Sequence, residues 1–264
     1  MLEMRSLEVG FRRYTGLLAQ NEARVLGPVD LSVKRGEVLA LVGASGAGKS
    51  LLAHALFGLL PANAHVRGHI LFEGVFLDGR TLAQLRGRKM GLLPQSTSHL
   101  DPLVRCGRQM AWAARRAGRP CDRRFVVEVL DRFDLSPAVL AAYPHALSGG
   151  MARRVMLAIA TIAEPDLVVA DEPTSGLDPR NAARVLRHLR RLASEGRGVL
   201  LITHDLVAAA PMADRVAILR DGLVAAIEPA SSFCGDGGQL VSRYARALWR
   251  AMPANGFALE QADA

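Results

Sequence analysis

Short apolar runs alternate with helix-like stretches along most of the chain. Four short runs have the pattern of strands: 38–42, which is continuously apolar, and 90–93, 167–170 and 199–203. A continuous apolar run of this length is typical of a strand that is buried on both faces of a parallel sheet. Helical spacing follows in other segments: 49–58, 150–163, 181–193 and 206–212. The pattern predicts an α/β fold with a parallel sheet.

Two regions depart from this alternation. The first forty residues contain short strand patterns at 7–11 and 29–33, and 69–77 has the pattern of an edge strand, so we expect an antiparallel β region there. Residues 96–146 are mostly helical in pattern, with breaks at glycines and prolines, which predicts an inserted helical subdomain at about 96–162. The first domain is expected to span 1–229.

The remaining residues, 230–264, are expected to form a linker and a helix. Ser231–Gly238 is rich in serine and glycine, and 241–251 has helical spacing. Asp221-Gly222, between two apolar runs just before this segment, is a hairpin signal.

Composition narrows the classes of protein. The chain has 264 residues, of which 50% are hydrophobic, so it can bury a sizeable core, and a disordered chain is excluded. No apolar run approaches the roughly 18 residues of a spanning helix, and the first residues lack the apolar core of a secretion signal. Three cysteines without metal-ligand spacing indicate a reducing compartment and no metal site built from cysteine.

The charge balance is basic. Lysine and arginine number 33 against 25 acidic residues, which gives a formal net charge of +8, and arginine supplies most of it. Such a surface suits anionic partners such as nucleotides, lipid headgroups or nucleic acid, but a solvated arginine-rich surface explains the charge equally well. Both interpretations stay open on charge alone.

A glycine-rich loop lies between the apolar run 38–42 and the helical stretch 49–58. It reads Gly43-Ala44-Ser45-Gly46-Ala47-Gly48-Lys49-Ser50, followed by Leu51. This fits the pattern G-x-x-x-x-G-K-[ST], in which backbone N–H groups turn toward phosphate oxygens at the positive end of a helix. Lys49 would reach the β- and γ-phosphates, and the Ser50 hydroxyl would bind Mg²⁺. A plain glycine turn is the alternative, but the strand–loop–helix context favours a phosphate site.

Two carboxylates, Asp171 and Glu172, end the apolar run 167–170. They would lie at the carboxyl edge of the sheet, where open α/β sheets bind ligands. One carboxylate there can hold Mg²⁺ through a water, and the next can polarise an attacking water, as hydrolysis of an anhydride requires. A solvated acidic turn is the alternative for an isolated pair, and the phosphate loop at the same edge favours the site.

A third motif, Leu147-Ser148-Gly149-Gly150-Met151, opens the helix 150–163. With it, the chain resembles the ATP-binding subunit of an ABC transporter over nearly its full length. The resemblance implies a P-loop NTPase core with ATP and Mg²⁺ as ligands. In that family this signature contacts the γ-phosphate of ATP held by the other copy of the domain, which is physically sensible because Ser148 and the glycine amides at a helix start form an anion site.

Single residues match the family's other landmarks. Gln95, after the strand that ends at Pro94, resembles the Q-loop glutamine, which touches Mg²⁺ and relays the nucleotide state to the helical subdomain. Asp171 resembles the Walker B aspartate, and Glu172 resembles the catalytic base.

Two further landmarks lie near the ends of strands. Residues 175–178, ending in Asp178, resemble the D-loop. His204 follows the strand 199–203 and resembles the switch histidine that orients the γ-phosphate. The family also places an aromatic residue against adenine: Phe11 is the better match because it ends the first predicted strand, and Tyr14 is its rival.

Features around these motifs are similar to the peptide and nickel importer group. Methionine follows the two glycines of the signature, and Ser98-His99-Leu100-Asp101-Pro102 is similar to that group's SLNP. Residues 244–248 fall where the group has an HPYTRALL-like stretch, but the His-Pro is missing here, and so is the cysteine cluster of some members' tails. The departures leave the solute open and argue against an iron–sulfur tail.

The resemblance implies an ATPase that powers solute import of the peptide, nickel or metal-chelate class. Its partners would be transmembrane permease subunits, a second ABC ATPase subunit as a homo- or heterodimer, and indirectly an extracytoplasmic solute-binding protein, at the cytoplasmic face of the cell membrane. No nucleic acid is expected as a partner. Each ATP would be held between 43–50 of one subunit and 147–151 of the other.

Three other functions compete with this interpretation. A soluble ABC ATPase acting on DNA or the ribosome fits the net charge, but such proteins usually carry two cassettes or a long coiled-coil insertion. A catalytically silent nucleotide sensor is disfavoured because Glu172 and His204 are both present. A phosphate-loop kinase has no use for the signature at 147–151.

Overall fold

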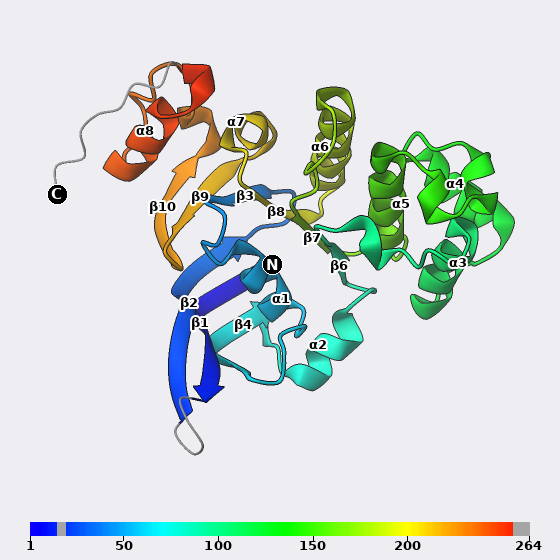
Figure 1. The fold of residues 1–264 in the computed structure, drawn as a ribbon, viewed down its shortest axis with the longest axis horizontal. Coiled ribbons are helices and arrows are strands. Elements are labelled where there is room, and N and C mark those ends of the chain that lie inside the picture. Colours follow the sequence, from blue (N-terminus) through cyan, green and yellow to red (C-terminus); the bar gives the residue numbers. More distant parts are fainter. Residues whose placement is uncertain (15–19, 256–264) are drawn as a thin grey trace.

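The computed structural model describes residues 1–14 and 20–255 of the chain. Its centre is a six-stranded sheet in the order β10-β9-β3-β8-β7-β6 (Figure 1). The strands are β3 (Val38–Gly43), β6 (Met90–Leu93), β7 (Leu167–Asp171), β8 (Gly198–Thr203), β9 (Arg215–Arg220) and β10 (Leu223–Pro229). All are parallel except β10, which pairs antiparallel with β9 across the Asp221-Gly222 turn. The predicted α/β class and parallel core are confirmed.

A second, antiparallel sheet has the order β2-β1-β4-β5. Its strands are β1 (Leu2–Tyr14), β2 (Gln20–Val33), β4 (Ala64–Phe72) and β5 (Val75–Phe76). The prediction of one edge strand at 69–77 is wrong, because Glu73 and Gly74 turn with positive φ and split the segment. The longer piece, β4, lies between β1 and β5 rather than at the edge. Local apolar spacing does not show which strands lie on either side.

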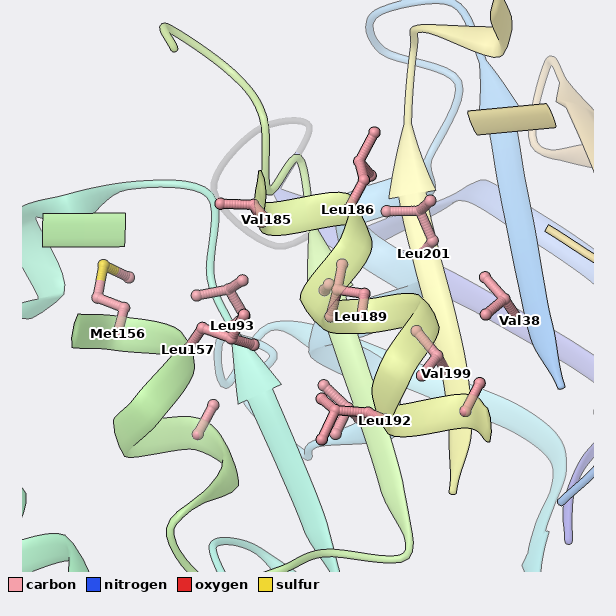
Figure 2. Packing of buried hydrophobic residues seen from close by; sticks show 14 of the residues in the cluster. Val38, Leu93, Met156, Leu157, Val185, Leu186, Leu189, Leu192, Val199 and Leu201 are labelled. Atoms are coloured by element: carbon pink, nitrogen blue, oxygen red, sulfur yellow. The ribbon is translucent and has the colours of Figure 1, made fainter. Parts of the chain in front are cut away.

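Two layers of apolar side chains cover the two faces of the central sheet. Leu39 and Leu41 of β3 pack with α1 (Lys49–Leu56) and the antiparallel sheet, whereas Val38, Ala40 and Val42 face the opposite layer. That opposite layer contains α5 (Gly149–Thr161), α6 (Pro179–Ser194) and α7 (Leu206–Ala209). Figure 2 shows Leu189 and Leu192 of α6 over the strand that carries Val199 and Leu201. The strands thus bury both faces, as their continuous apolar runs predict.

The helical region lies at one side of the sheet, beyond β6 (Figure 1). It contains α3 (Cys106–Arg116) and α4 (Arg123–Asp131), which pack with α5 through buried residues such as Met110, Leu130 and Val155. One helix, α2 (Gly79–Leu85), has no signal in the apolar spacing because it buries only Leu82. The capping box between Asp78 and Thr81 is the local signal that could have revealed it.

Within the C-terminal segment, residues 233–249 pack on the domain. Helix α8 (Arg243–Arg250) contacts β10, where the Ser242 N–H donates to Glu228 at 2.6 Å. Phe233 and Trp249 meet edge to face, and the Trp249 indole N–H donates to the Gly235 carbonyl at 3.0 Å. In the part of the chain that the structure describes, no helix is long and apolar enough to cross a bilayer.

Candidate functional site

The glycine-rich loop joins β3 to α1 at the carboxyl edge of the central sheet. Gly46 and Gly48 have φ values of 82° and 100°, in the left-handed region that glycine enters without strain. Gly43 is equally constrained by space, because a Cβ atom there would lie 2.4 Å from the Leu219 carbonyl oxygen of β9. The two glycine positions with positive φ and the crowded one explain why the loop needs this sequence.

Lys49 opens α1 and turns its side chain back over the loop. Its ammonium group donates to the carbonyl oxygens of Gly43 at 2.8 Å and Ala44 at 2.9 Å, and only 6% of the residue is exposed. The Glu172 carboxylate lies 3.9 Å from the same nitrogen. A positive charge is therefore held inside the loop, where a phosphate group would meet it.

Ser50 and Asp171 link the loop to β7. The Ser50 hydroxyl donates to Asp171 Oδ1 at 3.2 Å. Burial raises the pKa of Asp171 above its usual value, whereas the hydrogen bond from Ser50 acts in the opposite direction. A hydroxyl and a carboxylate at this separation are oxygen ligands of the kind that Mg²⁺ prefers.

Glu172 is buried and held by neighbouring strand ends. Its φ of 46° is unusual for a residue other than glycine, and its backbone N–H donates to the Ile202 carbonyl of β8 at 2.8 Å. Its Oε2 lies 2.8 Å from His204 Nδ1, and the Thr203 hydroxyl donates to the same oxygen at 3.5 Å. The His204 ring is largely exposed, with 63% of its side chain accessible. The pair forms an oriented carboxylate with an imidazole on the open side.

A cavity of about 530 Å³ lies beside the loop, and the predicted residues Gly43, Ala44, Ala47 and Asp171 are not part of its lining. Most of the predicted site residues outside the signature are part of its lining: Phe11, Ser45, Gly46, Gly48, Lys49, Ser50, Leu51, Gln95, Glu172 and His204. Phe11 of β1 is half-buried and is part of the lining, and its contact with a base stays a prediction. The side chain of Tyr14, its rival, lies outside the part that the structure describes.

Sequence reasoning missed two participants. Val25 of β2 lines the cavity beside Phe11 although nothing in its local sequence distinguishes it. Thr203, the last residue of β8, donates to Glu172 and also accepts from the Asp205 N–H at 3.1 Å. Because Thr203 directly precedes the predicted His204, the sequence could have indicated it as a site residue.

The cavity fits a magnesium nucleotide by the chemistry of its walls. The backbone at Gly46 is open, since a Cβ atom there would meet no atom of residues 1–14 and 20–255 within 4 Å, and this leaves room for an anion beside the loop N–H groups. Lys49 supplies the positive charge, and Ser50 with Asp171 supplies oxygen ligands. Phe11 offers an apolar surface for a planar base.

The predicted signature lies elsewhere. Ser148 caps α5 by accepting a hydrogen bond from the Met151 N–H at 3.3 Å. Ser148 and Gly149 are exposed, and no residue of 147–151 lines the cavity at the glycine-rich loop. Asp178 lies close to the signature instead, as the cap of α6. Hydrogen bonds from Asn181 lower the pKa of Asp178.

Several known proteins are similar to this chain in sequence. Residues 26–175 match the ABC transporter family. An oligopeptide transport ATP-binding protein, OppD, of Lactococcus lactis subsp. cremoris is 36% identical over 233 residues, which are 84% of this chain and 68% of the relative. The nickel import ATP-binding protein NikD of Pseudomonas putida is 40% identical over 225 residues, 81% of this chain and 86% of the relative. An OppD of Mycobacterium tuberculosis is 38% identical, and the matched part is only 38% of its length.

Solved structures share the fold. A dimeric ATP-binding cassette in a post-hydrolysis state with ADP and Pi bound has a TM-score of 0.75 and 27% identity, covering 87% of this chain and 99% of that one. An ATP-binding subunit of an ABC transporter has a TM-score of 0.71 and 31% identity, covering 88% of this chain and 91% of that one.

Proposed function

The chain belongs to the ABC transporter family, and from that premise we propose that it is the ATP-hydrolysing subunit of a solute importer. The observation that carries the proposal is the meeting of Lys49, Ser50, Glu172 and His204 at one cavity beside the phosphate loop. The relatives named for oligopeptide transport and nickel import support peptides, nickel or metal chelates as the class of solute. The importing membrane subunits are separate chains in this proposal.

The site residues divide the work on ATP. Residues 43–51 hold the phosphates, with Lys49 beside the β- and γ-phosphates, and Phe11 stacks on adenine. Ser50, Gln95 and Asp171 hold Mg²⁺. The bound ion supplies charge neutralisation at the phosphate oxygens.

Glu172 acts as the general base in this mechanism. Its carboxylate accepts a proton from the water that attacks the γ-phosphate. His204 fixes the carboxylate through Nδ1 and leaves Nε2 to face the phosphate, because the contact with Glu172 occupies only one ring nitrogen. The strained backbone at Glu172 is consistent with a side chain that must be aimed at one place.

A second subunit completes each site. Residues 147–150 and Asp178 lie away from the cavity of their own chain and expose Ser148 and Gly149. In the proposed head-to-tail dimer they contact the γ-phosphate held by the partner. ATP binding closes the dimer, and hydrolysis reopens it.

A large groove supports a membrane partner. It has a volume of about 760 Å³, lies beside Pro94 and His99, and is walled by α3 through the half-exposed Trp112 and by the apolar Leu59. An apolar cytoplasmic segment of a transmembrane subunit suits this groove, because much of its wall is apolar and it contacts both Pro94, the residue before the cavity-lining Gln95, and α3 of the helical region. The chain would therefore work at the cytoplasmic face of the cell membrane.

Nucleotide-driven association of the Glu172→Gln form tests the proposal. Hydrolysis should fall about 1,000-fold because the general base is lost, whereas Mg·ATP should still bind and drive dimer formation in light scattering. Wild-type chain with Mg·ADP is the matched control and should remain dissociated. Unchanged turnover in Glu172→Gln, or no association with itself or with a related cassette, contradicts the proposal.

Co-purification from membranes tests the partner. The tagged chain should recover integral membrane subunits, and their recovery should fall when Trp112 in the groove is changed to Glu. Recovery of nucleic acid or ribosomes in their place would favour a soluble ABC ATPase.

A further inference from the structure

Arg153 is a buried arginine in the second turn of α5, shortly after the signature. Only 4% of the residue is exposed. One terminal nitrogen donates to the Pro94 carbonyl at 2.8 Å, and the other approaches the Ser175 carbonyl at 3.5 Å. A planar guanidinium therefore spans two loops that are far apart in sequence.

The two acceptor loops both belong to the proposed nucleotide machinery. Pro94 directly precedes Gln95, which lines the nucleotide cavity. Ser175 begins the segment 175–178, whose Asp178 caps α6. The first loop leaves β6 and the second follows β7, and these strands are paired in the central sheet. Arg153 thus joins the ends of two neighbouring strands to the helix that carries the signature.

The burial of this charge is not offset by an ion pair. Burial lowers the pKa of Arg153, and Asp171 offsets only part of the effect. Within residues 1–14 and 20–255, no carboxylate lies at ion-pair distance from Arg153, and its Nε is buried without a hydrogen-bond partner. An apolar side chain of similar size would avoid the desolvation penalty. Stability alone therefore does not account for an arginine here.

A second contact ties the signature to the same segment. A Cβ atom at Gly150 would lie 2.6 Å from Asn181 Cγ, so the helix start approaches α6 as closely as glycine allows. The Asn181 amide donates to Asp178 Oδ2 at 2.6 Å. The start of α5 and the cap of α6 are therefore in direct contact, and Arg153 links this pair to the loop of Gln95.

We propose that Arg153 is a positioning residue that couples Gln95, at the chain's own nucleotide, to Ser148–Gly150 and Asp178, which face the nucleotide of the other subunit. The inference rests on the proposed function. A shift of the Gln95 loop upon nucleotide binding moves the Pro94 carbonyl, and the guanidinium transmits this shift to Ser175 and to α5. This coupling needs two hydrogen-bond donors on one rigid plane, so a single ammonium group cannot replace the guanidinium.

Arg153→Lys is the discriminating variant because it keeps the charge but has only one side-chain nitrogen. We expect ATP affinity within about threefold of wild type, because Arg153 does not line the nucleotide cavity. We expect kcat to fall about tenfold with little change in KM, and association of the Glu172→Gln form to weaken by a similar factor, as for loss of one charge-assisted hydrogen bond. Each is measured on the full chain.

Arg154→Lys is the matched control. Arg154 is the next residue and is also buried: its Nη1 donates to the carbonyls of Phe133 and Asp134 after α4, and its Nε donates to the Gly150 carbonyl within α5, but it contacts neither Pro94 nor Ser175. This variant should lower the unfolding temperature without separating kcat from KM. Arg153→Met, which keeps the length without the charge, should fold at least as stably as wild type and show the same loss of association as Arg153→Lys.

The outcomes separate the two proposals. Loss of kcat and association at retained ATP affinity in both Arg153 variants supports the coupling. It is overturned if Arg153→Lys and Arg153→Met retain both within twofold, or if ATP affinity, kcat and unfolding temperature fall together. Absence of hydrolysis and of association in the wild-type and Glu172→Gln chains would instead overturn the proposed function.

Discussion

Two helix starts in this molecule carry similar chemistry but differ in how complete they are. The start of α1 at Lys49 is surrounded by groups from other elements of its own chain, including Asp171 of β7, Glu172 and His204. The start of α5 has a serine cap, Ser148, and two glycines, and of these three residues Ser148 and Gly149 are exposed while Gly150 is buried. Both can present backbone N–H groups to an anion.

The two helix starts differ in how many loops of the same chain meet at them. Parallel strands bring the loops at their carboxyl ends to one edge, so the site at α1 assembles within one chain. The helical region that carries α5 lies to the side of that edge (Figure 1). At this helix start Gly150 packs against Asn181 of α6, whereas Ser148 and Gly149 are exposed, which agrees with the dimer proposed above.

The largest expected effect comes from Lys49→Ala, which removes the positive charge from the complete site. ATP affinity should fall by roughly 100- to 1,000-fold, because charge-assisted contacts to two phosphates are lost. Equilibrium binding measures it. Lys89→Ala is the control, since Lys89 is exposed and pairs with Asp166. Unchanged affinity in Lys49→Ala would remove the distinction between the two helix starts.

The packing contact between α6 and the helical region should become less stable at low pH. Burial, with Arg191 as the next cause, lowers the pKa of His188 to about 4, and its ring packs against Phe133. The unfolded chain takes up this proton near its ordinary pKa of about 6.5. The contribution of neutral His188 to the free energy of unfolding is therefore complete above about pH 6.5. It is lost as the pH falls toward 4, and the loss is up to ~3 kcal/mol.

Chemical unfolding at pH 7 and pH 4.5 measures this dependence. His188→Leu keeps a side chain of similar bulk and should be less sensitive to pH over the same interval. If the free energy of unfolding falls equally between pH 7 and pH 4.5 in wild type and in His188→Leu, His188 does not titrate as described.

Phe11→Ala sharpens the account of the complete site at its base-binding end. Loss of stacking should weaken ATP about tenfold, from ~1–3 kcal/mol per stacked base. The effect should be much smaller for inorganic triphosphate, which has no base to stack. Competition binding with both ligands gives the comparison, and equal losses for the two would assign Phe11 to packing alone.

Gly149→Ala probes the incomplete site with the smallest change. Among the described residues, a Cβ there meets only Leu177, at 3.8 Å, so the single chain should fold and bind ATP normally. Association of the Glu172→Gln form should weaken about fivefold, because a methyl group intrudes where a partner's phosphate approaches an exposed N–H. Gly150→Ala would not serve, since its Cβ clashes with Asn181 inside the same chain. Normal association of Gly149→Ala would contradict the role of this helix start.

Local sequence determined much of this protein because its signals act over a few residues. Continuous apolar runs fixed the buried strands of the central sheet, and the glycines, Lys49 and Ser50 fixed the phosphate loop. The nearly invariant geometry of a strand–loop–helix unit explains why such short patterns suffice. The capping residue Ser148 likewise predicted the start of α5.

Tertiary structure decided what depends on neighbours distant in the chain. The position of β4 inside its sheet, the contact of Val25 with the cavity and the span of Arg153 between Pro94 and Ser175 have no local signal. Side-chain spacing records which face a residue presents, but not what packs against that face. Those partners are set only when the sheets and the helical region come together.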